Sequence, residues 1–266
     1  MTAEIVERIR RSTRYRDVDA ALVERLAAEE LPKSRNGDEA VKRVKRRLHQ
    51  AVGAFRGSPP ASLAVAWHGD LGEPGFRAAC REAMQAHAST RERIGHLEGF
   101  YPAIWEVTGV PGRLLDLGSG LNPLALPWMG LAPDAAYIAI DADERPLATV
   151  REFLDLVGQP HEIVAADLAA VVPSHRVDVA VLLKLVTTLD RQDPDAAARL
   201  LRGLDASHAV VSFTTRSLSG RRSGMEPTYR RRLDRLVADA GRVSGLAEAS
   251  VANELVFVLT LDPLRA

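Results

Sequence analysis

The spacing of apolar residues separates a helical first part of the chain from a second part in which short strands alternate with helices. Up to about residue 105 the apolar positions recur at helical intervals. The longest stripe advances by three or four residues at a time and comprises Val41, Val44, Leu48, Val52 and Phe55. It predicts an amphipathic helix over residues 38–55, and a further helix is expected over residues 74–87.

From residue 113 onward, strand-like and helical segments alternate. The strand-like runs lie at residues 113–116, 137–141, 161–164, 177–182, 209–213 and 255–261. The helical stretches between them lie at residues 144–156, 194–204 and 228–240. Repeated strand–helix units form a parallel sheet covered on both faces, and residues 242–246 with 255–261 suit a terminal hairpin. We therefore predict an α/β fold, with a helical N-terminal domain over residues 1–105 and a sheet domain over residues 106–266.

Charge is distributed unevenly, although the formal net charge of the chain is zero. Residues 33–56 hold eight basic and two acidic residues, and residues 216–235 hold seven basic and two acidic ones. A neutral total argues against a nucleic-acid partner, but the field close to a surface depends on local charge. The two basic segments are therefore candidates for a face that binds a polyanion.

Cysteine, histidine and hydropathy patterns narrow the classes of protein that remain. The single cysteine, Cys80, excludes an internal disulfide and a cysteine-based zinc site, and the seven histidines show no metal-binding spacing. The first 16 residues are charged and amphipathic, unlike a signal peptide. No apolar run reaches the roughly 18 residues that a membrane helix needs. We therefore expect no metal, no membrane span and a cytoplasmic protein.

A short glycine motif follows the first predicted strand. Residues 114–120 read Leu-Leu-Asp-Leu-Gly-Ser-Gly, and Gly118 and Gly120 allow a tight turn and close approach of a ligand. The third glycine of the dinucleotide-binding pattern is missing, and Asp116 would repel a pyrophosphate. A cofactor with a cationic end, S-adenosylmethionine, suits Asp116 better than NAD does. A turn without a ligand is the alternative for so short a motif.

Two further acids end the next two predicted strands. Asp141 ends the second strand, where an acid in nucleotide-binding sheets accepts hydrogen bonds from ribose hydroxyls. Asp167 follows the third strand, where it could accept from the exocyclic amine of adenine. The carboxyl ends of successive parallel strands meet at one edge, so these two acids and Asp116 predict one cofactor crevice. A helix N-cap is the alternative role for Asp141.

A long polar loop follows the fifth predicted strand, on the same edge as the crevice. Residues 213–225 contain several arginines that suit phosphates, and Met225 could pack against a flat base. A solvated basic loop is the alternative. No acid–base pair stands out, and Ser119 lacks the sequence frame of a hydrolase nucleophile.

With these motifs in place, the chain resembles the 16S rRNA (guanine(1405)-N(7))-methyltransferases, which confer aminoglycoside resistance. The resemblance covers nearly the whole chain and rests on residues 31–37, 42–50, 87–93, 116–124, 182–185 and 215–226. It implies a class I (Rossmann-like) methyltransferase sheet preceded by a helical domain that docks on rRNA. It also implies S-adenosylmethionine as cofactor, 16S rRNA in the 30S subunit as partner, and a monomeric enzyme. Methylation of N7 of guanosine 1405 implies resistance to 4,6-disubstituted deoxystreptamine drugs.

The resemblance also assigns roles to individual residues. The implied cofactor contacts are Arg93, Asp116, Gly118, Asp141, Asp167, Leu168, Leu183 and Gln192, with Arg93 paired to the methionine carboxylate. The implied contacts with the target nucleotide are Arg191, Arg216, Arg221 and Met225. The implied RNA contacts are Lys33, Arg35, Arg43, Arg46, Arg47 and Lys184, and for each base a solvated surface charge is the alternative. No catalytic acid or base is implied, because N7 of neutral guanine already carries a lone pair and alignment with the methyl group suffices.

Three other functions compete with this interpretation. A small-molecule methyltransferase would share the crevice but would not need the basic helix at residues 38–55. A non-catalytic RNA-binding factor on the same fold would not need the three acids of the crevice. A methyltransferase for N1 of adenosine 1408 differs from the preferred interpretation only in its target, and here the resemblance alone favours the guanosine.

Overall fold

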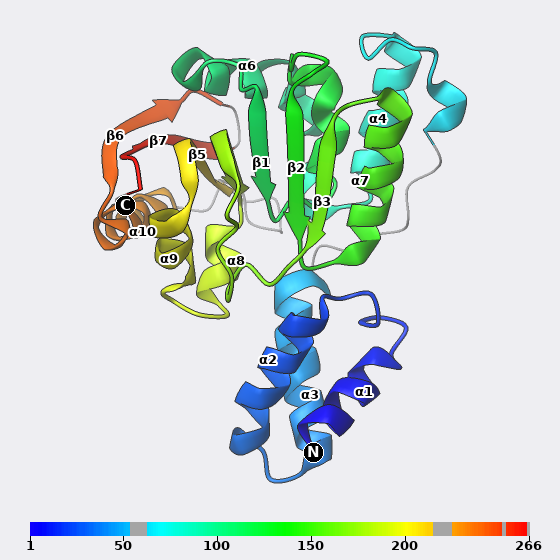
Figure 1. Cartoon of the computed structure of the whole chain (residues 1–266), viewed down its shortest axis with the longest axis vertical. Helices are drawn as coiled ribbons and strands as arrows, with labels where there is room; N and C mark the ends of the chain where they lie inside the picture. The colour runs from blue at the N-terminus through cyan, green and yellow to red at the C-terminus, as the bar shows by residue number, and fades with distance from the viewer. Residues whose placement is uncertain (54–62, 215–224, 252–253, 265–266) are drawn as a thin grey trace.

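The computed structural model describes residues 1–53, 63–214, 225–251 and 254–264. Within these residues a seven-stranded sheet has the order β3-β2-β1-β4-β5-β7-β6 (Figure 1). Its strands are β1 (Arg113–Leu117), β2 (Ala136–Asp141), β3 (His161–Ala165), β4 (Arg176–Leu183), β5 (Asp205–Thr214), β6 (Val243–Ala249) and β7 (Glu254–Leu261). Strands β1 to β5 run parallel, whereas β7 pairs antiparallel with both β5 and β6. The predicted parallel sheet with a terminal hairpin is therefore confirmed.

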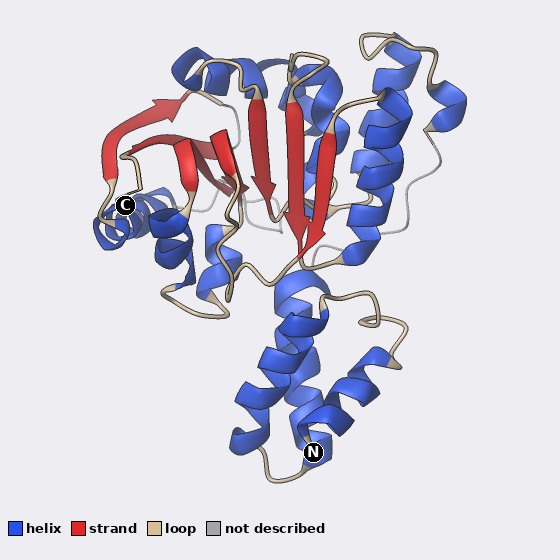
Figure 2. Cartoon of the chain, in the orientation of Figure 1, coloured by secondary structure: helices blue, strands red, loops and turns tan. Residues whose placement is uncertain are grey.

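Helices cover both faces of the sheet (Figure 2). One face packs against α4 (Pro74–Met84), α6 (Leu97–Thr108) and α7 (Glu144–Val157). The other face packs against α8 (Val186–Asp190), α9 (Ala196–Gly203) and α10 (Glu226–Ala240). Successive residues of a strand point to opposite faces, so Leu114 belongs to the first core and Leu115 to the second. The central strands β1, β2, β4 and β5 are largely buried on both sides and hold the residues at their carboxyl ends in fixed positions.

Residues 1–53 form a three-helix bundle, which we name the N-terminal helical unit. It comprises α1 (Thr2–Arg10), α2 (Ala20–Glu30) and α3 (Gly37–Leu48), and it has a hydrophobic core of its own. The side chain of Asn36 caps α3 by accepting a hydrogen bond from the backbone N–H of Glu39, at 2.9 Å. Figure 1 shows the unit beside the carboxyl ends of the central strands, where β1, β2 and β3 point towards it.

The helix predicted over residues 38–55 ends earlier than the apolar stripe suggested. The α-helical part stops at Leu48, and a π-helical turn continues over His49–Gly53. Val52, in that turn, is still buried in the core of the N-terminal helical unit. Phe55, the last residue of the predicted stripe, lies outside the described residues.

The hydrophobic cores divide at a different place from the domain boundary predicted at residue 105. Phe76 and Trp105, from α4 and α6, lie in the same core as Leu114 and Tyr137 of the sheet. These helices are amphipathic in sequence, but their apolar faces pack on the strands and not on α1 to α3. Among the described residues, the core of the N-terminal helical unit reaches Val52, and the core on this face of the sheet begins at Leu63.

The described part of the chain shows neither a candidate metal site nor a candidate membrane span, and its cysteine is buried. No helix there combines the length and apolar character needed to cross a membrane. No group of three or more His, Cys, Asp or Glu side chains there could hold a metal ion. Cys80 is buried, and burial raises the pKa of its thiol to about 12, which keeps the thiol protonated and unreactive at neutral pH.

Candidate functional site

A cavity lies at the carboxyl ends of the parallel strands, between the sheet and the N-terminal helical unit. Its walls include six of the residues expected to contact a cofactor, namely Gly118, Asp141, Asp167, Leu168, Leu183 and Gln192. Ala51 and Val52 of the N-terminal helical unit also line it. The hollow encloses about 690 Å³ when the open solvent at its mouth is counted. Two of the three acids predicted to form one crevice, Asp141 and Asp167, line this hollow.

The glycine motif after β1 reaches the cavity through Gly118, and its two glycines occupy positions where a side chain does not fit. Gly118 has a φ of 67° and Gly120 a φ of 49°, a region that side chains disfavour. A Cβ on Gly118 would lie 2.8 Å from Cδ1 of Leu185, and one on Gly120 would lie 2.7 Å from Cε1 of His87. A side chain at either glycine would therefore displace a neighbour, and Gly118 lines the cavity with its backbone alone.

Asp141 ends β2 and faces the cavity as a half-buried carboxylate. Its two oxygens accept hydrogen bonds from the backbone N–H groups of Gly120 and Asp143, both at 2.9 Å. The N-cap of α7 is Asp143, which accepts from the N–H of Arg145, so the alternative N-cap role of Asp141 is excluded. Burial raises the pKa of the Asp141 carboxyl to about 6. Asp141 thus ties the glycine motif to β2 and keeps acceptor capacity towards the cavity.

Asp116 and Arg93 differ from the prediction, because neither is among the residues that line the cavity. Asp116 is 1% exposed and accepts hydrogen bonds from Nδ2 of Asn122 at 2.9 Å and the hydroxyl of Tyr137 at 2.7 Å. Burial raises the pKa of Asp116 to about 6. The side chain lies beneath the glycine motif, where it supports the turn from inside.

Arg93 belongs to the same buried network. Its Nε and Nη2 donate to the two oxygens of Glu254, each at 3.1 Å, and its Nη1 donates to Oδ1 of Asn122 at 2.7 Å. The neighbouring Arg93 charge lowers the pKa of Glu254 against the opposing effect of burial. In this structure Glu254 pairs with the guanidinium of Arg93. The sequence prediction had paired that guanidinium with the methionine carboxylate of the cofactor. Sequence reasoning missed Glu254, which is about 160 residues from Arg93 along the chain.

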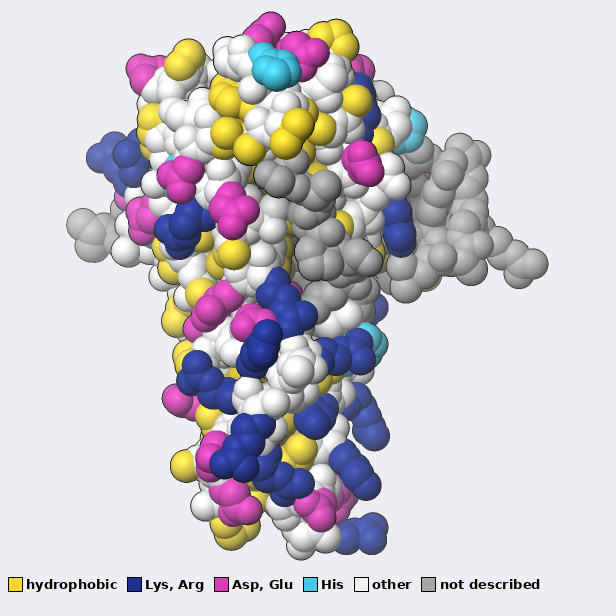
Figure 3. Space-filling model, turned by 90° about the vertical axis from the view of Figure 1, so that its right-hand side faces the viewer, with side chains coloured by type: hydrophobic (Ala, Val, Ile, Leu, Met, Phe, Trp, Pro, Cys, Tyr) yellow, Lys and Arg dark blue, Asp and Glu magenta, His cyan; other side chains and the backbone are white. Residues whose placement is uncertain are grey.

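The candidate RNA contacts fall into two groups. Figure 3 shows Lys and Arg side chains gathered over the N-terminal helical unit. The more accessible candidates, three of them paired with acids of the same unit, are Lys33, Arg35, Arg43 and Arg46. Arg47 is only 17% exposed and contacts Glu29, Glu30 and the carbonyl oxygen of Gln192. Its predicted role as a free phosphate contact is therefore not supported by its position.

Lys184 also differs from the prediction, because its side chain is turned into the protein. It is 10% exposed, donates to Glu92 at 2.6 Å and to the carbonyl oxygen of Ser89 at 3.0 Å, and lies 3.2 Å from Glu254. Its φ of 60° is rare for a residue with a side chain. Lys184 lines the cavity, so we assign it to the cavity wall and not to an outer RNA-binding face.

The residues predicted to surround the target base are only partly described. Arg191 is exposed directly after α8, next to the cavity residue Gln192. Met225 is 39% exposed at the start of α10. Arg216 and Arg221 lie outside the described residues. Their proposed contacts with the nucleotide remain predictions.

The cavity walls fit S-adenosylmethionine. Gly118 lines the cavity without a side chain, Asp141 offers acceptors to ribose hydroxyls, and Asp167 offers one to an adenine amine. Leu168 and Leu183 supply apolar surface for the flat ring, and the carboxylates favour a cationic ligand. When bound there, the cofactor supplies an electrophilic methyl group on a sulfonium.

The raised pKa of Asp141 leads to a pH-dependence prediction. The ionised carboxylate accepts ribose hydroxyls better than the acid, so the affinity for S-adenosylhomocysteine is expected to fall as the pH drops below about 6. The slope should approach tenfold per pH unit, as for one linked proton. Because folding raises this pKa from 3.8, protonation between about pH 6 and pH 4 favours the folded state, so weaker binding there is not due to unfolding through Asp141.

Calorimetric titration of the wild-type protein and Asp141→Asn between pH 5 and pH 8 measures this effect. The variant is expected to bind weakly at every pH, without the step near pH 6. An unchanged step in Asp141→Asn would show that another group, such as buried Asp116, causes it.

Comparison with known proteins gives a consistent result. The family model described as ribosomal RNA methyltransferase (FmrO) matches residues 11–258. A Frankia casuarinae protein named 16S rRNA (guanine(1405)-N(7))-methyltransferase is 38% identical over 95% of this chain and 91% of its own length. A protein of the same name from Micromonospora olivasterospora is 41% identical over 79% of this chain and 72% of its own. The crystal structure of 16S rRNA methyltransferase RmtF in complex with S-adenosyl-L-homocysteine is similar with a TM-score of 0.82 and 30% identity, covering 98% of both chains.

Proposed function

We propose that this chain, which belongs to the ribosomal RNA methyltransferase (FmrO) family, transfers a methyl group from S-adenosylmethionine to N7 of guanosine 1405 of 16S rRNA. The observation that carries this proposal is the cavity formed by Gly118, Asp141 and Asp167 in a chain so similar to guanosine-1405 methyltransferases. The substrate is the folded RNA of the 30S subunit, and the enzyme acts as a monomer in the cytoplasm.

Alignment is the main catalytic contribution of the protein. N7 of guanine carries a lone pair and loses no proton before it is methylated, so the site needs no general base. The protein must hold the attacking nitrogen in line with the transferred methyl group. Burial lowers the pKa of His87 to about 4, so this cavity residue stays neutral at pH 7 and adds no positive charge beside a cationic cofactor.

The target base must leave its helix to reach the cavity. The major groove of A-form RNA is deep and narrow, so N7 is poorly accessible in a duplex, and flipping the nucleotide costs a few kcal/mol. Arg191 and Met225 are exposed, and their guanidinium and thioether groups are suited to receive a phosphate and a flat base. We assign them to the flipped nucleotide, together with Arg216 and Arg221.

The N-terminal helical unit supplies the docking surface for 16S rRNA. Its exposed bases suit contacts with phosphates, which position a protein on folded RNA without reading sequence. Such contacts would let the enzyme recognise one surface of the 30S particle. The small-molecule alternative gives no role to this basic surface, and the non-catalytic alternative gives none to the cavity.

Drug resistance provides a cellular test of the proposed function. Methylated N7 carries a positive charge, which weakens drug contacts at that position. We expect bacteria that express the chain to grow in gentamicin and kanamycin, and to stay sensitive to an inhibitor of a different ribosomal site. Sensitivity to both drugs despite soluble expression would contradict the proposal.

The docking assignment predicts different results for two neighbouring arginines. Arg46 is exposed, so Arg46→Glu is expected to weaken 30S binding about tenfold and reduce its salt dependence, while S-adenosylhomocysteine binds as before. Arg47→Glu is expected to weaken both, because Arg47 donates to the carbonyl oxygen of the cavity residue Gln192 at 3.0 Å. Filter binding to 30S and calorimetry with the cofactor product measure the two affinities.

A matched control is Arg176→Glu, which reverses an exposed charge at the opposite edge of the sheet, at the start of β4. It should change neither affinity. Equal 30S affinity of Arg46→Glu and the wild-type protein would remove Arg46 from the docking surface.

A further inference from the structure

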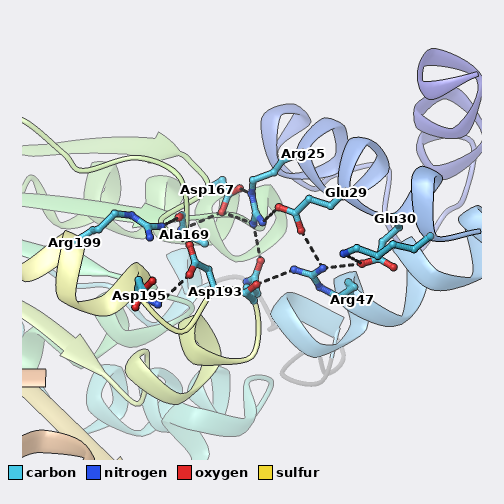
Figure 4. Close-up of polar contacts among 11 residues, drawn as sticks. Arg25, Glu29, Glu30, Arg47, Asp167, Ala169, Asp193, Asp195 and Arg199 are labelled. Carbon is cyan, nitrogen blue, oxygen red and sulfur yellow. Dashed lines mark hydrogen bonds and ion pairs between the residues drawn. The ribbon is translucent and has the colours of Figure 1, made fainter. Parts of the chain in front are cut away.

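Arg25 reaches from α2 of the N-terminal helical unit to the wall of the cofactor cavity (Figure 4). Its Nε donates to Oδ2 of Asp167 at 2.6 Å, and its Nη2 donates to Oδ1 of the same carboxylate at 3.2 Å. The Asp167 side chain is 3% exposed and that of Arg25 21%. A paired guanidinium of this kind fixes the plane of a carboxylate as well as balancing its charge.

Gln192 is held by the same guanidinium. Nη2 of Arg25 contacts Oε1 of Gln192 at 2.9 Å. Because a guanidinium has donors only, the amide of Gln192 must turn its oxygen towards Arg25. Arg47 donates to the backbone carbonyl of Gln192, and Glu29 accepts from both arginines at 2.8 and 3.0 Å. These contacts close a ring of four residues, Arg25, Glu29, Arg47 and Gln192, which leaves the amide little freedom to rotate.

The ring determines which hydrogen-bonding groups remain for a ligand. A carboxylate has about four acceptor positions, and Asp167 uses three of them, two for Arg25 and one for the N–H of Ala169. One acceptor position is left on Oδ2. The oxygen of Gln192 accepts from Arg25 and so faces the guanidinium, and within the described residues nothing accepts a hydrogen bond from Nε2. The cavity wall therefore offers one acceptor from Asp167 and one donor from Gln192.

This pair of groups matches adenine. The adenine edge presents an exocyclic amine, which donates, next to a ring nitrogen, which accepts. Hypoxanthine presents the reverse pattern, a carbonyl oxygen next to a ring N–H. We propose that Arg25 is a specificity-determining positioning residue, which makes the cavity select an adenine nucleoside by fixing the acceptor of Asp167 and the donor of Gln192. The inference rests on the proposed function in that it takes this cavity as the cofactor site.

The proposal gives the N-terminal helical unit a second role. Besides offering a surface to RNA, the unit supplies the side chain that orders one end of the cofactor site. The preference of that site for adenine then depends on how α2 packs against the sheet, because Arg25 belongs to α2.

The test compares two probes, S-adenosylhomocysteine and its deaminated analogue S-inosylhomocysteine, by calorimetry on the full-length protein. The wild type is expected to prefer the adenine compound strongly. Arg25→Met removes every polar contact of the guanidinium and frees the Gln192 amide to turn its oxygen towards a ring N–H. The preference is expected to fall about tenfold, the size of one mispaired hydrogen bond. Arg25→Lys should show an intermediate preference for the adenine compound, because one ammonium can face Asp167 but cannot contact all three partners of the guanidinium.

Two further variants separate positioning from general stability. Gln192→Met keeps the Arg25–Asp167 pair but removes the donor, and it should lose preference as Arg25→Met does. Arg8→Met removes a guanidinium that pairs with Asp38 at 2.7 Å elsewhere in the same unit, and it should keep the wild-type preference. If Arg25→Met binds both probes more weakly by the same factor, or binds them as the wild type does, the proposal is overturned. Failure of the wild-type protein to bind S-adenosylhomocysteine would instead refute the cofactor site itself.

Discussion

Asp141→Ala is expected to reduce S-adenosylhomocysteine affinity by at least about a hundredfold, and to reduce methyl transfer at sub-saturating cofactor by at least as much. The substitution removes the acceptor for two ribose hydroxyls. Hydrogen bonds to a charged group contribute about 1.5–3 kcal/mol each, so two of them account for a loss of this size. It also releases the N–H of Gly120, which Asp141 holds at 2.9 Å, and so loosens the glycine motif.

The chain offers a matched control in Asp178. This exposed carboxylate also accepts two backbone N–H groups, those of Gly112 and Arg113, both at 2.8 Å, but at the opposite edge of the sheet. Asp178→Ala removes the same number of backbone contacts and should leave cofactor affinity unchanged. Equal losses in the two variants would mean that Asp141 acts through the stability of the sheet and does not contact the cofactor.

Arg93→Met is expected to lower the free energy of unfolding by about 3–5 kcal/mol, because it leaves Glu254 as a buried carboxylate without its main partner. The two side chains are 2% and 4% exposed. The loss also removes a donor to Asn122, which connects the pair to Asp116 under the glycine motif. Urea unfolding followed by circular dichroism measures the change.

The double variant Arg93→Met/Glu254→Met separates a coupled pair from two independent effects. The double variant no longer leaves the Glu254 carboxylate buried without its partner, so it should be more stable than Arg93→Met alone. Arg230→Met breaks a pair with Glu248 whose side chains are 42% and 44% exposed, and it should cost less than about 1 kcal/mol. Additive losses in the double variant would contradict the assignment of a buried, coupled ion pair.

The parts of the site that follow from local sequence were predictable. Each parallel strand ends at the same edge of the sheet, so the order of Gly118, Asp141 and Asp167 along the chain was enough to bring them to one cavity. The strands themselves are short apolar runs between turn residues, and their predicted limits differ from the observed ones by a few residues at most.

Contacts between distant segments were not predictable. Nothing near Arg93 in sequence indicates that Glu254 pairs with it, and nothing near Asp167 indicates Arg25. Charge counts failed for a related reason, since they treat every base as exposed. Arg47 and Lys184 are basic in sequence, but acids from other segments neutralise them in partly buried networks. The extent of the N-terminal helical unit was also not predictable, because the sequence of an amphipathic helix does not show which element packs against its apolar face.

Mapping the modified nucleotide tests the central claim most directly. Purified 30S subunits are incubated with S-adenosylmethionine and the wild-type protein or Asp141→Ala. The 16S rRNA is then reduced and cleaved with aniline at N7-methylguanosine, and primer extension locates the break. The account predicts a stop at guanosine 1405 with the wild-type protein and little or none with the variant. Modification at another position, such as adenosine 1408, or no modification of 30S at all, would contradict it.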